Sequence, residues 1–452
     1  MNEIEKARKI LKNREKSFKK EKDNVIKTSF LETHEYILEQ IGPATRATAN
    51  INSRRLKNYK YIKYTKLTDK IEVIEEFEYE GIIYKPIFSN LIEKNSVKLP
   101  SGIEEYKSVA EIITDIKTYL YSYFDPPKFY EDFLPYYVLF TWVYDQFPFI
   151  AYLHFVGLTG TGKTIAAETV ANVCYKPVDA AGSVTISSIF RLADQWRGTL
   201  FLDEFDLSSF GKDGYKAILT FLKTGVSDRA VLRVEGDKKR EIESFIVKAP
   251  KIFTSETPIT DAGLQSRTFV IKMEKSKKHL PLYKLDSYYD NAVKIRNKLL
   301  LWRFRNLNKI DLKSMEFGIE ELMHFDRRVQ QVITPIYYLS DEKARVNLLE
   351  FAKQQEDETY RQRRESLEGQ IFQFIFENQE KATTVSMVFE NINKGRKGKE
   401  ISERKIGNLI RKTLGFDVER LGHENVSTVI LNPYKVNELT EYYGLTDGEI
   451  KK

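Results

Sequence analysis

Cysteine is nearly absent from this sequence of 452 residues, since Cys174 is the only one. One thiol cannot form an internal disulfide or a cysteine zinc site, so both are excluded. The lysine-rich N-terminus lacks the apolar run of a secretory signal. Residues 134–157 are the most apolar stretch, but prolines, an aspartate and a glutamine interrupt it, which predicts a core helix and a buried strand, not a membrane span. We therefore expect a cytoplasmic, soluble protein with no membrane partner.

A large excess of one charge is also lacking. Lys and Arg number 72 against 65 Asp and Glu, a net charge of +7. The position of the charges is therefore more informative than their sum. Hydrophobic residues make up 42% of the chain, which is enough for large cores and excludes a wholly disordered protein. The length corresponds to about three domains.

The order of sequence patterns divides the chain into five segments. Residues 1–28 form a basic N-terminal arm, which is either a solvated surface or a nucleic-acid contact. Residues 29–105 alternate β-rich runs with turn residues and predict a small β-rich N-terminal domain. Residues 106–275 hold two helices and then alternating strands and helices, the pattern of a parallel α/β sheet. Residues 276–365 are helical and charged, and residues 366–440 change pattern again.

A phosphate-binding loop is the clearest motif. Residues 157–164 match G-x-x-x-x-G-K-S/T, with an apolar strand before them and a helix after them. Backbone N–H groups of such a loop cradle phosphate oxygens at a helix N-terminus, Lys163 reaches the β- and γ-phosphates, and Thr164 binds Mg²⁺. The sequence therefore predicts ATP and Mg²⁺ as ligands. The predicted phosphate-binding residues are Gly157, Thr159, Gly160, Thr161, Gly162, Lys163 and Thr164.

Two carboxylates follow the next β-prone run, residues 199–202. Asp203 suits Mg²⁺ coordination and Glu204 suits activation of the attacking water. An acid at the end of a buried strand often marks only the point where the chain returns to solvent. The phosphate loop upstream nevertheless favours the interpretation that these acids take part in hydrolysis. Asp206 is interpreted as structural.

A third strand over residues 249–256 ends in polar residues. We expect Ser255 or Glu256 to lie between the two carboxylates and the γ-phosphate. Arg267 then precedes one more apolar strand. It is a candidate for stabilising charge at a neighbouring subunit's γ-phosphate, with a surface salt bridge as the alternative.

These motifs, in this order and spacing, resemble the AAA+ ATPase module over residues 106–275. Two β-prone runs, 229–234 and 241–247, form a hairpin before the third strand. That insertion is similar to superfamily-3 and minichromosome-maintenance-type helicases and to helicase-like ATPases of mobile genetic elements. The resemblance implies a hexamer and a helical lid over residues 276–365. Many relatives have Asn at the end of the third strand, where this chain has Ser255 and Glu256.

The hairpin turn is basic. In the related helicases this hairpin lines the central channel of a ring, so the resemblance implies DNA contacts by Lys238, Lys239 and Arg240, while a solvated turn is the alternative. Four further arginines have open roles. Arg191 is either an inter-subunit contact or a salt bridge, and the lid arginine that the family uses as a second sensor of ATP is one of Arg296, Arg327 and Arg328.

The C-terminal segment predicts three helices and two strands, an order that resembles a winged helix. Its third helix, residues 402–414, has Ser402 as N-cap and is rich in Lys and Arg. Such a helix suits contact with duplex DNA through Arg404, Lys405 and Arg411. Winged helices also serve as protein-interaction modules.

The sequence as a whole favours an α/β protein built on an AAA+ parallel sheet. The predicted function is an ATP-driven DNA helicase or translocase, a hexameric ring acting in replication of a mobile genetic element. The alternative is an ATP-dependent DNA-binding initiator or switch without processive unwinding. The expected DNA partner is single-stranded or forked, and a primase or an initiator is a candidate further partner. The N-terminal region shows no primase-like site of its own.

Overall fold

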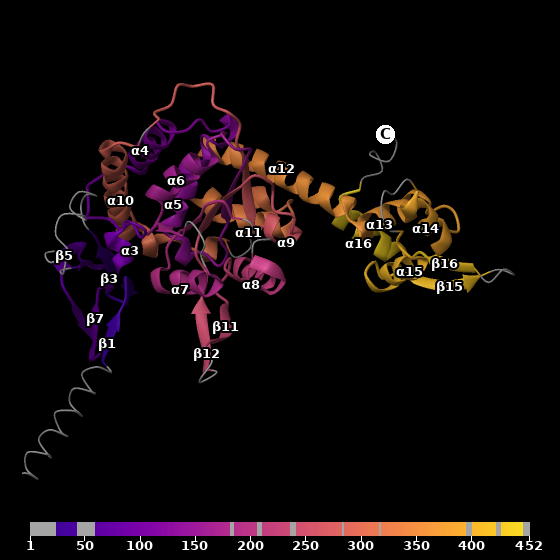
Figure 1. Cartoon of the computed structure of the whole chain (residues 1–452), viewed down its shortest axis with the longest axis horizontal. Coiled ribbons are helices and arrows are strands. Elements are labelled where there is room, and N and C mark those ends of the chain that lie inside the picture. The colour runs from indigo at the N-terminus through magenta and orange to yellow at the C-terminus, as the bar shows by residue number, and fades with distance from the viewer. Residues whose placement is uncertain are drawn as a thin grey trace, which may run out of the picture. The chain divides into compact units, whose positions relative to one another are not determined.

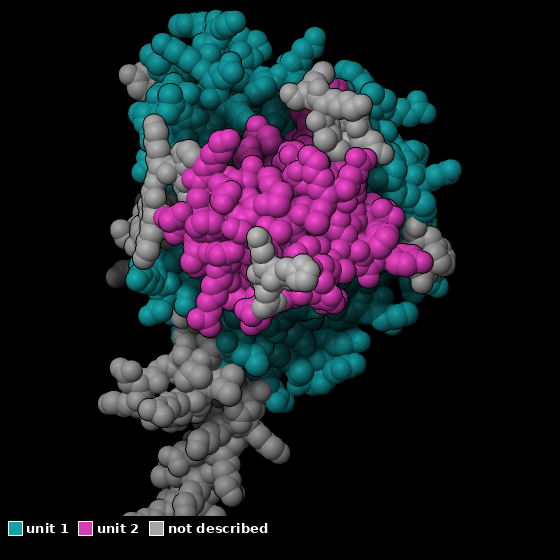
Figure 2. Space-filling view, turned by 90° about the vertical axis from the view of Figure 1, so that its right-hand side faces the viewer, with its two compact units in different colours: residues 1–349 teal, residues 350–452 magenta. Residues whose placement is uncertain are grey.

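The computed structural model describes residues 24–42, 59–180, 185–205, 210–235, 241–282, 284–315, 318–394, 400–421 and 426–445, with the backbone alone at 233–235 and 241–242 (Figure 1). The chain forms two compact units, residues 1–349 and 350–452, which Figure 2 draws in different colours. Among the described residues, no helix has the length and apolar content that crossing a bilayer requires.

Two small sheets form the N-terminal part of the first unit, as the alternating β-rich runs predicted. The four-stranded antiparallel sheet has the order β2-β3-β4-β5, and the three-stranded sheet has the order β1-β7-β6. A short helix, α3 (Asn90–Glu93), follows them. Their bounds are β1 Val25–Lys27, β2 Phe30–Glu32, β3 Tyr36–Ile41, β4 Lys60–Thr65, β5 Lys70–Ile74, β6 Phe77–Tyr79 and β7 Ile82–Lys85.

A five-stranded parallel sheet lies at the centre of the first unit. Its order is β14-β8-β13-β10-β9, so β13 lies between β8 and β10. All five residues of β8 are buried, because helices cover both faces of a parallel sheet. The bounds are β8 Tyr152–Val156, β9 Val178–Asp179, β10 Leu200–Leu202, β13 Lys251–Ser255 and β14 Thr268–Lys272. The mixed α/β fold with a parallel sheet is thereby confirmed.

Helices surround this sheet (Figure 1). They are α4 Val109–Tyr121, α5 Phe133–Thr141, α6 Lys163–Val173, α7 Ile186–Trp196, α8 Gly211–Thr224, α9 Ala262–Gln265, α10 Asp286–Asn306 and α11 Arg327–Leu339. The next helix, α12 (Glu342–Glu365), begins in the first unit and continues into the second. Short 3-10 turns cover Lys128–Tyr130, Tyr144–Gln146, Leu307–Lys309, Lys313–Met315 and Glu320–Leu322. Helix α5 is buried on all sides, which explains its dense aromatic content as core packing.

The predicted hairpin is present. Strands β11 (Ala230–Glu235) and β12 (Glu241–Ile246) pair antiparallel, with Ala230 opposite Ile246 and Glu235 opposite Glu241. Figure 1 shows the pair projecting from the body of its unit. The backbone N–H of Ile246 donates to Asp194 Oδ1 on α7 at 2.9 Å, which fastens the hairpin base to a helix of the sheet.

Three buried charges and the partly buried Asp145 link the N-terminal sheet to the region of the central sheet. Lys176 Nζ lies 2.8 Å from Glu39 Oε2, and Arg303 Nε lies 2.8 Å from Glu39 Oε1. Arg303 also donates to both carboxylate oxygens of Asp145, at 2.9 and 2.6 Å. Glu39, Lys176 and Arg303 are at most 1% exposed. We call Glu39, Asp145, Lys176 and Arg303 the junction cluster.

The second unit has the predicted order of three helices and two strands. A further helix, which the sequence reasoning did not include, ends it. A core of its own holds these elements together, with Ile371, Phe372, Val388, Ile406 and Ile410 wholly buried. The bounds are α13 Leu367–Glu377, α14 Val385–Asn393, α15 Glu403–Lys412, β15 Asp417–Leu421, β16 Val426–Ile430 and α16 Pro433–Tyr443.

Candidate nucleotide-binding site

The glycine-rich loop joins β8 to α6 in the way that the motif requires. Gly160 and Gly162 have φ of +85° and +82°, a left-handed conformation that glycine adopts without strain. A Cβ atom at Gly157 would lie 2.8 Å from the Met273 carbonyl oxygen, so a side chain does not fit there. Lys163 is the first residue of α6 and is 9% exposed. The loop N–H groups and Lys163 thus face the space in which phosphates would bind.

Asp203 lies directly beside the loop. Its Oδ1 accepts hydrogen bonds from Thr164 Oγ1 at 3.0 Å and from Thr254 Oγ1 at 2.7 Å. Oxygen ligands of this kind suit Mg²⁺, which proteins hold with one or two carboxylates together with substrate phosphates. Among the described residues, no three His, Cys, Asp or Glu side chains form a group that could hold a metal ion. Thr164 and Asp203 therefore fit a metal that is shared with a nucleotide.

Glu204 adopts an unusual backbone conformation. Its φ is +49°, which costs free energy for a residue with a Cβ atom. The Glu204 N–H donates to Thr254 Oγ1 at 2.9 Å, and the next N–H, of Phe205, donates to the Thr254 carbonyl at 2.8 Å. Thr254 is wholly buried, so these bonds hold the chain at Glu204 in this conformation.

Thr254 is the residue that sequence reasoning missed. The polar end of β13 was predicted to lie here, but the prediction selected Ser255 and Glu256. The available signal was a threonine directly after two buried apolar residues of the strand and next to two further polar residues. Strand alternation alone does not say which of the three faces the carboxylates.

Ser255 lines the cavity, but its hydroxyl is already hydrogen-bonded to neighbouring groups. Its hydroxyl donates to the Thr257 carbonyl at 2.5 Å, and His154 Nε2 lies 2.6 Å from the same Oγ. Since the serine proton is already used, His154 is the donor in the second bond. Burial lowers the pKa of His154 to about 3, so its ring is neutral. The Ser255 proton is therefore directed to the backbone.

Glu256 reaches the phosphate loop instead. Its Oε1 accepts a hydrogen bond from Thr159 Oγ1 at 2.5 Å. Two of the predicted residues, Thr159 and Glu256, are thus joined directly, although they are 97 positions apart. This contact places a carboxylate at the rim of the loop.

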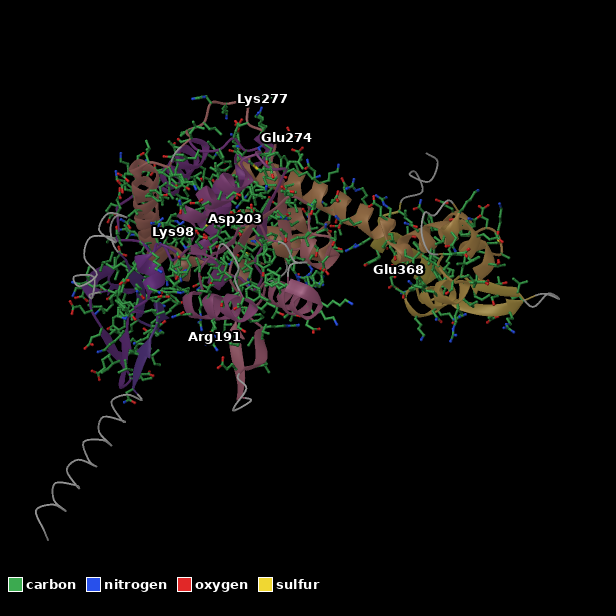
Figure 3. The ribbon with its side chains drawn as sticks, in the orientation of Figure 1. Lys98, Arg191, Asp203, Glu274, Lys277 and Glu368 are labelled. Atoms are coloured by element: carbon green, nitrogen blue, oxygen red, sulfur yellow. The ribbon has the colours of Figure 1, made fainter. Side chains whose placement is uncertain are left out.

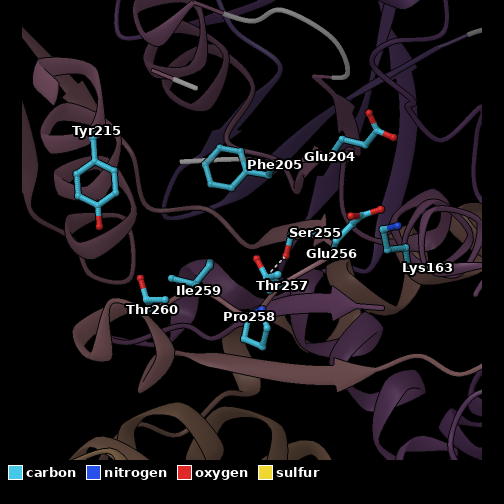
Figure 4. Close-up of a pocket in the computed structure, with 10 residues that line it drawn as sticks. All are labelled: Lys163, Glu204, Phe205, Tyr215, Ser255, Glu256, Thr257, Pro258, Ile259 and Thr260. Atoms are coloured by element: carbon cyan, nitrogen blue, oxygen red, sulfur yellow. Dashed lines mark hydrogen bonds between the residues drawn. The ribbon is translucent and has the colours of Figure 1, made fainter. Parts of the chain in front are cut away.

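A cavity of about 590 Å³ lies beside these groups, and several of them line it. Because β13 lies between β8 and β10, its end lies next to both the loop that follows β8 and the acids that follow β10. Figure 4 shows Lys163, Glu204 and Glu256 on one side of the cavity and Tyr215 and Thr260 on the other. The lining residues are Lys163, Glu204, Phe205, Tyr215, Ser255, Glu256, Thr257, Pro258, Ile259 and Thr260.

Arg267 lies where the strands of the sheet begin, at the end opposite to the phosphate loop. Its carbonyl accepts from the N–H of Tyr152, where β8 begins, whereas the phosphate loop follows the other end of β8. Five strand residues span about 16 Å, so the two are far apart within one chain. Burial lowers the pKa of Arg267, and the positive charge of Arg328 lowers it further. The structure therefore brings Arg267 together with Arg328 and not with Lys163.

Two other arginines have partners inside the chain. Arg296 is buried and donates to the Asn172 carbonyl at 2.5 Å, near the end of α6 that is remote from Lys163. That position does not fit the sensor role considered for it. Arg191 Nη2 lies 3.7 Å from Glu243 Oε2 on β12, and both side chains are exposed. Arg191 therefore contacts the hairpin (Figure 3).

The predicted DNA contacts fall in two places. Lys238, Lys239 and Arg240, at the hairpin turn, lie outside the described residues. Arg404, Lys405 and Arg411 are exposed on α15 of the second unit.

Comparison with known proteins finds only a weak structural similarity to solved structures. No family model and no curated protein matches the sequence. Among solved structures, three of the NrS-1 C-terminal region in its apo form are similar, each 14% identical and covering 87% of this chain and 96% of that chain. Their TM-scores are 0.40, 0.41 and 0.39. A likeness at this level carries no conclusion about activity, which has to rest on the site itself.

Proposed function

We propose that this protein is a Mg²⁺-dependent ATP hydrolase that uses hydrolysis to translocate on or unwind DNA. One observation carries the proposal: the phosphate loop and the acid-bearing strand meet, with Thr164 Oγ1 3.0 Å from Asp203 Oδ1, at a cavity that Lys163 and Glu204 line. A lysine, a hydroxyl and two acids in this relation are what phosphoryl transfer to water requires.

Each side chain has a defined task in this mechanism. The loop N–H groups and Lys163 bind the β- and γ-phosphates and offset their charge. Thr164 and Asp203 would hold Mg²⁺, which would supply positive charge to offset that of the phosphates. Glu204 orients a water molecule and accepts its proton. Thr254 fixes the position of both acids through its two hydrogen bonds.

Arg267 supports a shared site between subunits. Its place at the edge remote from its own phosphate loop suits action on a neighbour's nucleotide in a ring, where it would stabilise charge on the transferred group. We expect Arg267→Ala to slow ATP turnover while leaving ATP affinity nearly unchanged. Steady-state hydrolysis and nucleotide titration measure the two effects. Arg361→Ala, on the exposed side of α12, is the matched control. Normal turnover by Arg267→Ala would remove the shared site from the proposal.

The hairpin is the proposed DNA-contacting element of the motor. Its base is tied to α7 by the bond between Ile246 and Asp194, so a movement of the ATPase core would carry the hairpin with it. Lys238, Lys239 and Arg240 would hold DNA phosphates without reading sequence. Neutralising all three is expected to abolish stimulation of hydrolysis by DNA and to spare basal hydrolysis. A hexameric assembly, a role in replication of a mobile genetic element and a primase or initiator partner belong to the same proposal.

Strand displacement tests the motor directly. Forked DNA with a single 3′ or 5′ tail is mixed with the protein and ATP, and Lys163→Ala serves as control. ATP-dependent displacement that the variant loses would establish a helicase, and the preferred tail would give its polarity. Hydrolysis stimulated by DNA without displacement would favour the second candidate, an initiator or switch. The exposed basic helix on a separate compact unit is the observation that favours that candidate.

A further inference from the structure

The end of β13 presents a carboxylate to the phosphate-binding loop. Glu256 Oε1 accepts a hydrogen bond from Thr159 Oγ1 at 2.5 Å. A loop of this kind attracts anions, because its backbone N–H groups point at the ligand from a helix N-terminus. A carboxylate of the same chain at this loop therefore competes with phosphate for the same positive potential. The mechanism proposed above gives Glu256 no task.

Glu256 lies at the end of the loop that would bind the terminal phosphate. Lys163, which reaches the β- and γ-phosphates in loops of this type, lines the same cavity as Glu256. Figure 4 shows both on the side of the cavity where Glu204, the proposed base for the attacking water, also lies. A bound triphosphate would fill this end of the loop, whereas a diphosphate would leave it empty.

The backbone on either side of Glu256 is held in place. The Gly157 N–H donates to the Ser255 carbonyl at 3.3 Å, which ties the end of β13 to the start of the loop. The Ser255 hydroxyl donates to the Thr257 carbonyl at 2.5 Å, which closes the turn around Glu256. Rotation of the Glu256 side chain is thus the simplest way for its carboxylate to leave Thr159.

The bond between Glu256 and Thr159 offsets the carboxylate charge only in part. A hydroxyl is a neutral donor, and a hydrogen bond from it is weaker than one from a charged group. A γ-phosphate at this end of the loop would bring further negative charge close to Glu256. Like charges a few Å apart disfavour each other, so the carboxylate has to turn away when a triphosphate binds.

We propose that Glu256 is a specificity-determining residue that sets the relative affinity of the site for ATP and ADP. Its carboxylate, bound to Thr159, holds the γ-phosphate end of the empty loop, and a triphosphate has to displace it whereas a diphosphate does not. The inference rests on the proposed function, since it concerns the same nucleotide site. Hydrolysis and release of phosphate let the bond re-form, so the empty and the ADP-bound loop share one arrangement.

Nucleotide binding to the full-length protein tests this role. The ligands are ADP and an ATP analogue with a non-hydrolysable β–γ bridge, both with Mg²⁺. Glu256→Gln keeps the size of the side chain and removes its charge. We expect this variant to bind the triphosphate about tenfold more tightly, the order of one hydrogen bond to a charged group, and to bind ADP within about twofold of the wild type.

The control variant is Glu274→Gln, an exposed acid that follows Met273, whose carbonyl lies beside Gly157. It removes one negative charge near the loop and should change neither affinity. Equal gains in affinity for both nucleotides in Glu256→Gln would overturn the inference, because the carboxylate would then not distinguish them. Weaker triphosphate binding by Glu256→Gln would overturn it too, since the carboxylate would then contribute to binding.

Thr159 tests the hydrogen bond separately. Thr159→Val keeps the shape of the side chain and removes the hydroxyl that holds Glu256. We expect it to bind the triphosphate more tightly, and the double variant with Glu256→Gln to gain little more, because both changes break the same bond. Thr159→Ser, which keeps the hydroxyl, should bind as the wild type does. A wild-type ratio of the two affinities in Thr159→Val, or additive gains in the double variant, would overturn the role of the bond.

The binding data also separate this inference from the proposed function. Wild-type protein that binds neither nucleotide would contradict both. Binding of both nucleotides with affinities that do not respond to Glu256→Gln would overturn the inference alone and leave the roles of Lys163, Asp203 and Glu204 in hydrolysis standing.

Discussion

Charged side chains gather in two places in the first unit, and they are held in opposite ways. In the junction cluster each buried charge meets an opposite charge, with Arg303 alone joining Glu39 and Asp145. At the cavity the charges are held by neutral groups, since Asp203 accepts from two threonines and Glu256 from Thr159. Among the described residues, no ion pair links Lys163 to an acid. Buried charges that are paired with one another are costly to leave unpaired, whereas charges kept apart at a cavity are available to a ligand.

Removal of the lysine at the cavity should give the largest functional effect. We expect Lys163→Ala to lower ATP hydrolysis by about 1000-fold, because Lys163 is the one cation among the described residues that line the cavity. The free energy of unfolding should change little, since no partner charge is left unpaired. Phosphate release assays and urea denaturation measure the two quantities. Large destabilisation by this variant would contradict the contrast between the two regions.

Replacement of Arg303 in the junction cluster should instead lower the free energy of unfolding. Arg303→Met leaves the partly buried Asp145 without its partner and the buried Glu39 with Lys176 alone, so we expect a loss of about 3 kcal/mol in the free energy of unfolding. Arg305→Met, at a partly exposed position and paired with exposed Glu105, is the matched control, with an expected loss of about 0–1 kcal/mol. Equal effects of the two variants in chemical denaturation would break the comparison.

The histidine behind the cavity should make stability depend on pH. The pKa of His154 is about 3 in the folded protein because of burial, and about 6.5 in an unfolded chain. The unfolded state therefore binds the proton first, and stability that is present above pH 6.5 is lost as pH falls toward 3. We expect a contribution of about 2 kcal/mol to disappear between pH 7 and pH 5. His154→Gln should show a shallower decline over this range, and an identical decline would refute the assignment.

Thr254 should give the smallest of these effects. Thr254→Val keeps the shape of the side chain and removes the hydroxyl that bonds Asp203 and the Glu204 N–H. Because the acids remain but lose a fixed position, we expect kcat to fall about tenfold with little change in KM. The matched variant Thr254→Ser, which keeps the hydroxyl, should retain most of the wild-type rate. A change in KM alone would show that Thr254 acts on binding and not on the position of the acids.

Local motifs allowed much of the fold to be predicted. The phosphate loop, the strand before Asp203, the hairpin and the order of the C-terminal elements each depend on residues close in sequence, whose periodicity and turn chemistry are readable. The junction cluster was not predicted, because Glu39 and Arg303 are 264 positions apart and only the fold brings them together. Neither was the choice among the polar residues that end β13, since it depends on the register in which β13 pairs with β10.

The partners of the helical arginines could not be predicted from the sequence either. Arg296 and Arg328 both lie on helices, as expected, but helical spacing does not give the direction from which a neighbour approaches. The fold directs Arg296 to the Asn172 carbonyl and brings Arg328 near Arg267.

The central claim is that the cavity is built to hydrolyse ATP with Glu204 as the base. The most direct measurement compares wild type and Glu204→Gln in ATP binding and in single-turnover hydrolysis, both with Mg²⁺. The account predicts that the variant binds ATP with wild-type affinity and hydrolyses it at least about 100-fold more slowly, because binding uses the loop and Lys163 while proton transfer uses the carboxylate. Hydrolysis by Glu204→Gln at the wild-type rate would contradict it.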